Sequence, residues 1–337
     1  MFFIHKYAPK DISETDINKE ELSKLKEMCN DPAFPNMIVY GPEGCGKKTA
    51  IRLALETIYN KSINNLSEAT YPIVNGSGTT VDVGVMQSDF HIVIEPKNNA
   101  SDKHIIQGVI KEYVKRNPIG LITHNKPFKV ILIDGIDDLS YYAQTSLRRT
   151  MEKYSNVCRF IMWSENISKV IEPLRSRCYL FRLRSPAEDV IFKVILDVMT
   201  FEKMEMDFDK INEVIDKSGR NIRNVLWNLQ LLKYGKELEI SYDKAIDKLV
   251  DGMMMCDMSY IGANRNLVYS LFITKYSGGK IIHDVVKKLV NDDELDDKCK
   301  LNIMFYGTKY DHRYEQGRRD IIHLDGFLIW SIREIGK

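Results

Sequence analysis

The chain has 337 residues, about twice the size of a typical domain, so we expect two or three domains. Charged residues make up 28% and hydrophobic residues 44%, which is typical of soluble globular proteins and excludes a wholly disordered, collagenous or membrane-embedded chain. The 48 Lys and Arg residues almost balance the 47 Asp and Glu residues, so any site for a polyanion must be local.

The cysteines and the N-terminus point to an intracellular protein. Six cysteines lie far apart without a C-x-x-C pair, which argues against a zinc ribbon and against a disulfide framework. The histidines show no metal-ligand spacing, so we predict no metal cluster. The apolar start is only four residues long, and no later apolar run approaches ~18 residues, so we expect neither secretion nor a membrane span.

Strand-like and helix-like patterns alternate through the first half of the chain. After a lead-in with a helix over 19–29, short β-branched and apolar runs predict strands at 36–40, 91–94, 129–133, 159–163 and 179–183. Helical patterns lie between them at 49–59, 101–114 and 138–154. This alternation predicts an α/β fold with a mostly parallel sheet that is covered by helices on both faces.

The second half is predicted to be helical. Ser185-Pro186-Ala187-Glu188 fits a capping box with proline at the first helical position, and no convincing strand follows it. We expect three or four short helices in 185–247 and several more after 253, including helices over 281–289 and 321–332. We therefore predict domains at 1–183, 184–248 and 249–337.

A glycine-rich loop follows the first predicted strand. Gly41-Pro42-Glu43-Gly44-Cys45-Gly46-Lys47 fits the pattern G-x-x-x-x-G-K between a strand and a helix, which is the context that a phosphate-binding loop requires. Its glycines let backbone N–H groups converge on an anion at a helix N-terminus. This context disfavours the alternative of an ordinary glycine turn.

The loop departs from the usual pattern at the next position. A Ser or Thr there normally supplies a hydroxyl to Mg²⁺, but this chain has Lys48, with Thr49 one residue further on. Because one residue turns a helix by ~100°, we expect Thr49 to point elsewhere. The sequence therefore supports Mg²⁺ only weakly.

A second departure lies at the end of the strand over 129–133. Asp134 follows this buried run and could hold a metal-bound water, but the next residue is Gly135, where hydrolysing ATPases commonly place a glutamate. That glutamate orients the attacking water, so we expect the pocket to bind nucleotide better than it cleaves it. The alternative is that Asp137 or Asp138 takes over this role.

Several motifs together resemble the small subunits of replication factor C, the sliding-clamp loader of the AAA+ class. They cover nearly the whole chain and are strongest over residues 3–230. The motifs are His5-Lys6-Tyr7-Ala8-Pro9-Lys10, Asn99-Ala100-Ser101-Asp102, Leu147-Arg148-Arg149-Thr150-Met151-Glu152, Ser176-Arg177-Cys178 and Gly219-Arg220-Asn221-Ile222-Arg223. Lys48 and the missing glutamate resemble the subunit type that keeps its arginine finger but has a degenerate ATPase site.

This resemblance implies an AAA+ P-loop domain over 1–183, a helical lid over 184–248 and a helical collar for oligomerisation over 249–337. It implies bound ATP or ADP, with Arg177 as an arginine finger that reaches a neighbouring subunit's nucleotide. Arg223 would meet the γ-phosphate, and the sensor asparagine would align with Glu165 or the adjacent Asn166. The implied nucleotide-binding residues are Tyr7, Ala8, Pro9, Gly41, Pro42, Gly44, Cys45, Gly46, Lys47, Lys48, Thr49, Asp134 and Arg223.

The resemblance also implies contacts with DNA and with a sliding clamp. Residues 97–129 hold seven basic and two acidic residues, and Lys103, His104 and Lys111 would track the DNA backbone. The alternative for each is an ordinary solvated helix face. Leu139, Tyr141 and Tyr142 would rest on the clamp, and at least one of the adjacent tyrosines should be exposed. One packed and one solvent-lying tyrosine is the alternative.

The implied function is that of one subunit in a heteropentameric loader that opens a sliding clamp and loads it on primer-template DNA. Its own ATPase site is predicted to be defective, so whether the chain is an enzyme by itself stays open. The resemblance implies a nuclear location, or a cytoplasmic replication compartment if the protein is viral. Two alternatives are a self-sufficient AAA+ ATPase and a nucleotide-independent replication or checkpoint adaptor.

Overall fold

The computed structural model describes residues 2–31, 34–59, 61–74, 78–95, 102–115, 128–236, 241–255, 260–273, 276–293, 295–316 and 320–336. The chain forms two compact units, residues 1–236 and residues 237–337. Within the described ranges, no helix is both long and apolar enough to cross a membrane. The Asn99-Ala100-Ser101 part of one motif, and the basic residues Lys97, Arg116 and Lys126, lie outside them. The domain boundaries expected at 183/184 and 248/249 stay predictions.

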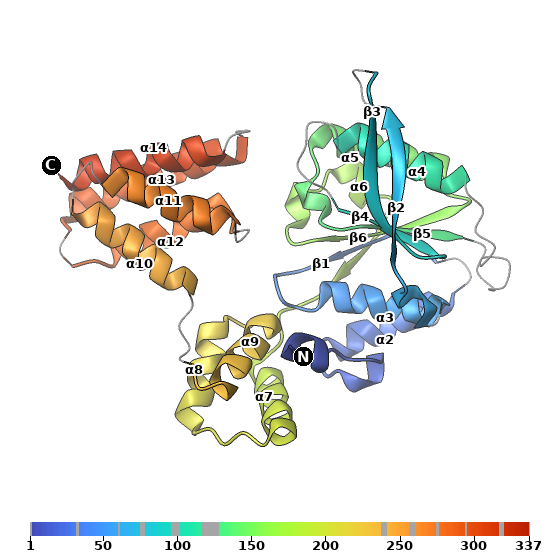
Figure 1. The fold of residues 1–337 in the computed structure, drawn as a ribbon, viewed down its shortest axis with the longest axis horizontal. Helices are drawn as coiled ribbons and strands as arrows, with labels where there is room; N and C mark the ends of the chain where they lie inside the picture. The colour runs from blue at the N-terminus through green and yellow to red at the C-terminus, as the bar shows by residue number, and fades with distance from the viewer. Residues whose placement is uncertain are drawn as a thin grey trace. The chain divides into compact units, whose positions relative to one another are not determined.

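A seven-stranded sheet forms the centre of the first unit, in the order β2-β3-β4-β5-β6-β1-β7 (Figure 1). The five strands from β4 to β7 in this order pair in parallel, as predicted, whereas β2 and β3 are antiparallel. The strands are β1 (Met37–Tyr40), β2 (Ser67–Val74), β3 (Thr80–Gln87), β4 (His91–Ile94), β5 (Lys129–Ile133), β6 (Cys158–Ser164) and β7 (Tyr179–Arg182).

The sequence analysis missed the β2–β3 hairpin. Its strands pair over their full length, from Ser67 opposite Gln87 to Val74 opposite Thr80. Most of the β3 side chains are exposed, and each strand holds a residue that is unfavourable in strands, Pro72 in β2 and Gly84 in β3. The hairpin therefore lacks the continuous apolar run that marks the buried strands.

Helices cover both faces of the sheet, as predicted (Figure 1). On one face, α2 (Lys19–Asn30) and α3 (Lys47–Tyr59) share a core with Met37 and Val39 of β1. On the other face, α4 (Asp102–Lys115) and α5 (Tyr141–Lys153) share a core with Ile38. Successive strand residues point to opposite faces, so one short strand contributes to both cores.

Helices also follow the last strand. The first unit continues with α7 (Glu188–Glu202), α8 (Phe208–Ser218) and α9 (Ile222–Lys233), and two short helices, α1 (Phe3–Lys6) and α6 (Glu172–Arg175), lie earlier in the chain. The second unit holds five described helices around one apolar core: α10 (Ser241–Met254), α11 (Tyr260–Ile273), α12 (Gly278–Val290), α13 (Asp297–Gln316) and α14 (Asp320–Ile335). The helices predicted over 281–289 and 321–332 are thus confirmed.

The predicted capping box before α7 is wrong. The helix begins at Glu188, its N-cap is Ala187, and no side chain caps it. Pro186 is buried and precedes the helix instead of forming its first residue. Ser185 lies three residues before the first helical residue, so it does not occupy the N-cap position.

The N-terminal segment is attached to α7 and α9 through Glu202. This carboxylate accepts hydrogen bonds from Lys6 Nζ at 2.6 Å, from the Tyr7 hydroxyl and from Lys233 Nζ at 2.5 Å. These hydrogen bonds, from Lys233 first and then from Lys6 and Tyr7, lower the pKa of Glu202 from 4.5 to about 2. The backbone N–H of Phe3 donates to Gln230 Oε1 of α9 at 3.0 Å. The segment over 2–7 is therefore fixed against these helices.

We expect Glu202→Gln to lower the free energy of unfolding at pH 7, because the hydrogen bonds of the folded state favour the charged form of this carboxylate. A lowered pKa stabilises the fold fully above about pH 4.5, and this contribution is lost as the pH falls towards about 2. Urea unfolding of both proteins between pH 7 and pH 3 should show the difference shrinking below about pH 4.5. A difference that stays constant over this range contradicts the assignment, and Glu205→Gln, at an exposed acid nearby, serves as the control.

Candidate functional site

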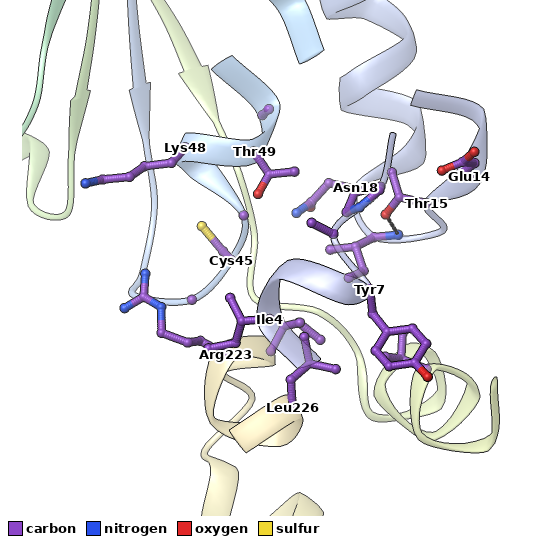
Figure 2. A pocket seen from close by; sticks show the side chains of 18 of the residues that line it. Ile4, Tyr7, Glu14, Thr15, Asn18, Cys45, Lys48, Thr49, Arg223 and Leu226 are labelled. Carbon is purple, nitrogen blue, oxygen red and sulfur yellow. Dashed lines mark hydrogen bonds between the residues drawn. The ribbon is translucent and has the colours of Figure 1, made fainter. Parts of the chain in front are cut away.

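A cavity of about 830 Å³ lies between the N-terminal segment, the glycine-rich loop, and helices α7 and α9 (Figure 2). Most of the residues predicted to bind nucleotide line it together: Tyr7, Ala8, Pro9, Gly44, Cys45, Gly46, Lys47, Lys48, Thr49 and Arg223. Three others, Gly41, Pro42 and Asp134, do not line it. The structure thus brings predicted residues from three distant parts of the sequence to one cavity.

The glycine-rich loop has the backbone conformation that its sequence predicts. Gly44 and Gly46 have φ angles of +71° and +95°, which side-chain-bearing residues rarely adopt. Lys47 is buried at the start of α3, where its ammonium donates to the carbonyl oxygens of Gly41 and Pro42, at 2.8 Å each. The loop therefore presents a buried cation at a helix N-terminus, an arrangement suited to an anion.

Lys48 places a second cation beside this loop. Its Nζ lies 2.7 Å from Asp134 Oδ2, which joins the start of α3 to the residue that follows β5. Asp134 faces a smaller adjacent cavity of about 220 Å³, and Lys48 and Trp163 line both cavities. The predicted acid is therefore near the glycine-rich loop, but the Lys48 side chain lies between them.

Trp163 is a site residue that the sequence analysis missed. It lies in β6, and its ring centroid is 5.2 Å from Lys47 Nζ and 5.3 Å from Lys48 Nζ. An aromatic face attracts cations at such distances, so one ring stabilises both ammonium groups. The only signal in the sequence was an aromatic residue near the carboxyl end of a predicted parallel strand.

In the segment after β6, Glu165 and Asn166 are the two candidates for the sensor position, and only one of them faces the cavity. Glu165 lines it, 3.9 Å from Lys47 Nζ, whereas the Asn166 side chain accepts a hydrogen bond from Ser168 N. Partial burial raises the pKa of Glu165, and Lys47 opposes this shift. The position predicted for a sensor asparagine therefore presents a carboxylate.

Asp137 and Asp138, the two candidates for a replacement catalytic acid, lie away from the larger cavity. Asp137 Oδ2 accepts hydrogen bonds from the backbone N–H groups of Glu165 at 3.0 Å and Asn166 at 3.1 Å. The Asp138 carboxylate lies beside Gly135, only 2.9 Å from where a Cβ on that glycine would be. Neither aspartate lines the larger cavity.

Helix α9 closes the cavity over the glycine-rich loop. Arg223 Nη1 lies 3.1 Å from Glu43 Oε1 in the loop, and both side chains are about half exposed. Asn221 caps α9 by accepting hydrogen bonds from the N–H groups of Arg223 and Asn224. The Asn221 amide also lies so close to Gly44 that a Cβ there would overlap it. Glycine at position 44 is therefore needed both for its φ angle and for this contact.

Arg177 lies on the surface of the first unit, just after α6. Its Nε donates to Glu152 Oε1 at 2.7 Å and its Nη1 to the Pro173 carbonyl at 2.8 Å. The short helix α6 is held by the buried Gln144, whose Oε1 accepts a hydrogen bond from Ile171 N and whose Nε2 donates to Lys169 O. The arginine is thus accessible and starts from a fixed backbone.

The residues predicted to contact DNA and a clamp are partly exposed. Lys103 and Lys111 are exposed on α4, and the side chain of His104 lies outside the described residues. Tyr141 and Tyr142 are 67% and 74% exposed, so the alternative that one of them is packed is wrong, and Leu139 is buried in the core. Lys129, counted with the basic residues, is also buried.

The ammonium of Lys129 explains why this lysine adds nothing to a basic surface. It donates to the carbonyl oxygens of Tyr113 at 3.0 Å and Val114 at 3.2 Å, near the end of α4. Burial lowers the pKa of Lys129. A cation at a helix C-terminus interacts favourably with the helix dipole, so Lys129 has a structural role.

Two family models match this chain, and three relatives that match nearly all of it are named as replication factor C subunits. A family model described as DNA polymerase III, delta subunit, matches residues 17–187, and one described as Replication factor C subunit 3, C-terminal domain, matches residues 254–337. A putative replication factor C small subunit of Acanthamoeba polyphaga mimivirus is 33% identical, covering 99% of this chain and 91% of that protein. Replication factor C subunit 3 of Arabidopsis thaliana is 28% identical, and the match covers 97% of this chain and 96% of that protein. Subunit 5 of Saccharomyces cerevisiae is 27% identical, with 97% of each covered.

We expect Gly44→Ala to destabilise the protein more than Gly46→Ala does. Both glycines have positive φ, but only a methyl group at position 44 overlaps the Asn221 amide, whereas nothing lies within 4 Å of one at position 46. Losing the Asn221 cap should cost about 1 kcal/mol beyond the backbone strain that both variants share. Thermal and urea unfolding of the two variants measures this difference, and equal losses would show that the contact between the loop and α9 contributes nothing.

Proposed function

Because the chain belongs to the replication factor C small-subunit family, an AAA+ clamp-loader family, we propose that it binds ATP or ADP without hydrolysing it and supplies Arg177 to a neighbouring subunit's nucleotide. The neighbours would be other loader subunits, joined through residues 249–337. The assembled complex would load a sliding clamp on primer-template DNA. The observation that carries the proposal is the contrast between an accessible Arg177 and a nucleotide cavity that neither Asp137 nor Asp138, the two candidate catalytic acids, lines.

Nucleotide binding is supported by the cations and the glycine-rich loop at the cavity. Lys47 and Arg223 lie at the loop that would hold phosphates, and each now has a protein partner that a phosphate oxygen could replace. The loop and the start of α3 add backbone N–H groups. Tyr7 lies on the other side of the cavity from Lys48 (Figure 2), and Pro9 also lines the cavity, so a base there would meet apolar and aromatic groups.

The lack of hydrolysis is supported by the surroundings of two residues. Gly135 has no side chain, and its φ of +78° disfavours any other residue there. Asp137 is already engaged by two backbone N–H groups, so turning it towards a water would cost both hydrogen bonds. These observations disfavour the alternative of a self-sufficient ATPase.

The arginine finger is supported by the position of Arg177. Its ion pair with Glu152 is solvent-exposed, with 39% and 48% of the two side chains accessible. Exposed pairs of this kind stabilise a fold by at most about 1 kcal/mol, so a phosphate can replace the glutamate at little cost. A guanidinium offers a planar, permanently charged fork that matches phosphate oxygens.

The proposed partners follow from exposed side chains on the first unit. Lys103 and Lys111 lie two turns apart on α4 and could follow a nucleic-acid backbone. Tyr141 and Tyr142 form an exposed aromatic pair with ring centroids 5.9 Å apart, which suits a protein interface such as that with a clamp. The protein would act where DNA is replicated, in the nucleus or in a cytoplasmic compartment if viral.

We expect the purified full-length chain to bind ADP and a non-hydrolysable ATP analogue while showing no ATP turnover above background. Isothermal titration calorimetry measures the binding, and a phosphate-release assay measures the turnover. Lys47→Ala should abolish binding, because it removes the buried cation of the loop. Turnover that disappears in Lys47→Ala would instead support a self-sufficient ATPase.

We expect Arg177→Ala to reduce the ATPase rate at one site of the assembled loader by a factor of about 10³ to 10⁵. The same variant should leave nucleotide binding by this chain unchanged, because Arg177 does not line the cavity. Arg182→Ala, at an exposed arginine on β7, is the matched control and should have no effect on the rate. Single-turnover measurements on the purified complex test this, and an unchanged rate in Arg177→Ala excludes the finger.

Glu152→Gln separates the finger from its partner on the same chain. If Arg177 leaves Glu152 to reach a phosphate, this variant keeps the finger and removes only the competing carboxylate. We expect the ATPase rate of the complex to stay at the wild-type value or to rise. A loss as large as that of Arg177→Ala would mean that the ion pair itself is required.

A further inference from the structure

The residues around the glycine-rich loop do not fit the Mg²⁺ that this fold family implies. Mg²⁺ requires oxygen ligands in near-octahedral geometry, and a Ser or Thr hydroxyl after the loop lysine is the usual protein ligand. Position 48 carries an ammonium, which has three donors and no acceptor and repels a cation. This ammonium lies 2.7 Å from Asp134 Oδ2, the carboxylate that would hold a metal-bound water.

Thr49 does not restore the missing ligand. It follows Lys48 on α3, so its side chain leaves the helix about 100° further round. Figure 2 shows the two side chains diverging, with Lys48 running away from the side of the cavity where Tyr7 lies. Among the residues that the structure describes, no cluster of His, Cys, Asp and Glu could hold a metal ion instead.

The Lys48 ammonium is held where it can serve phosphates. Asp134 fixes it from one side, and the Trp163 ring, at 5.3 Å, attracts it from another. Lys48 is the second residue of α3, so its side chain starts from the helix N-terminus at which phosphates bind. An ammonium that is bonded to one carboxylate oxygen keeps two N–H donors for phosphate oxygens.

We propose that the Lys48 ammonium, paired with Asp134, replaces Mg²⁺ in this site, so that the protein binds the free nucleotide and not its Mg²⁺ complex. The inference rests on the proposed nucleotide binding and adds which ionic form of the nucleotide is recognised. A tethered cation supplies one positive charge where Mg²⁺ supplies two. It also donates hydrogen bonds directly to phosphate oxygens. Added Mg²⁺ should therefore compete with the protein for the nucleotide, so the affinity of the protein for the nucleotide should stay unchanged or fall.

The test is calorimetric titration of the full chain with ADP and with a non-hydrolysable ATP analogue, once in EDTA and once in excess Mg²⁺. We expect wild-type affinity in EDTA to equal or exceed that in Mg²⁺. Lys48→Thr restores the usual hydroxyl, so it should lose about tenfold or more in EDTA and regain affinity with Mg²⁺. Lys48→Met, the matched control, should show the same loss without regaining affinity.

The outcomes separate this inference from the proposed function. Wild-type binding that strengthens tenfold or more with Mg²⁺ overturns the inference and leaves nucleotide binding intact. Equal behaviour of Lys48→Thr and Lys48→Met in Mg²⁺ also overturns it. Absence of wild-type binding under both conditions contradicts the proposed function itself. Unfolding curves of the three proteins without nucleotide show whether either substitution disturbs the fold, which we do not expect because Lys48 is exposed.

Discussion

Parallel pairing of the central strands is the constraint on which the site depends. β1 lies between β6 and β7 and pairs with both in parallel, with Tyr40 opposite Ser164 and Arg182. Parallel strands in one sheet have their carboxyl ends at the same edge, where ligands of open α/β sheets bind. The glycine-rich loop after β1, Asp134 after β5 and Glu165 after β6 therefore meet. A shift of β5 or β6 would separate Asp134 or Glu165 from the lysines at the loop.

Three cations at the glycine-rich loop are each paired with a group of their own chain. Lys47 is bonded to loop carbonyls, Lys48 to Asp134, and Arg223 to Glu43. Arg177, the proposed arginine finger, is likewise paired with Glu152. The pairs of Arg223 and Arg177 are exposed and stabilise the fold only slightly, so these two arginines can exchange a carboxylate for a phosphate at a small cost in free energy. Asp137 differs, because its two hydrogen bonds hold the backbone in place.

Sequence patterns identified the buried part of the fold. The strands predicted at 36–40, 91–94 and 129–133 match β1, β4 and β5 within one residue, because buried parallel strands are short, continuous apolar runs. The β2–β3 hairpin was missed and the cap of α7 was predicted wrongly, because neither feature has a continuous apolar pattern in the sequence. Exposed strands carry mixed side chains, and a cap depends on the local backbone as well as on the residue types. Lys129 has the composition of a basic surface but caps a helix inside the protein.

The sequence by itself determined the glycine-rich loop, the lysine in place of the Mg²⁺-binding hydroxyl and the glycine in place of a catalytic glutamate, because each depends on residue type at a fixed position in a motif. Only the tertiary structure decided what these residues contact. It placed Trp163 beneath both lysines, turned Asp137 towards the backbone after β6 and brought Lys48 to Asp134. Such contacts join residues far apart in the chain, and their geometry follows from strand register and side-chain packing, which no local pattern encodes.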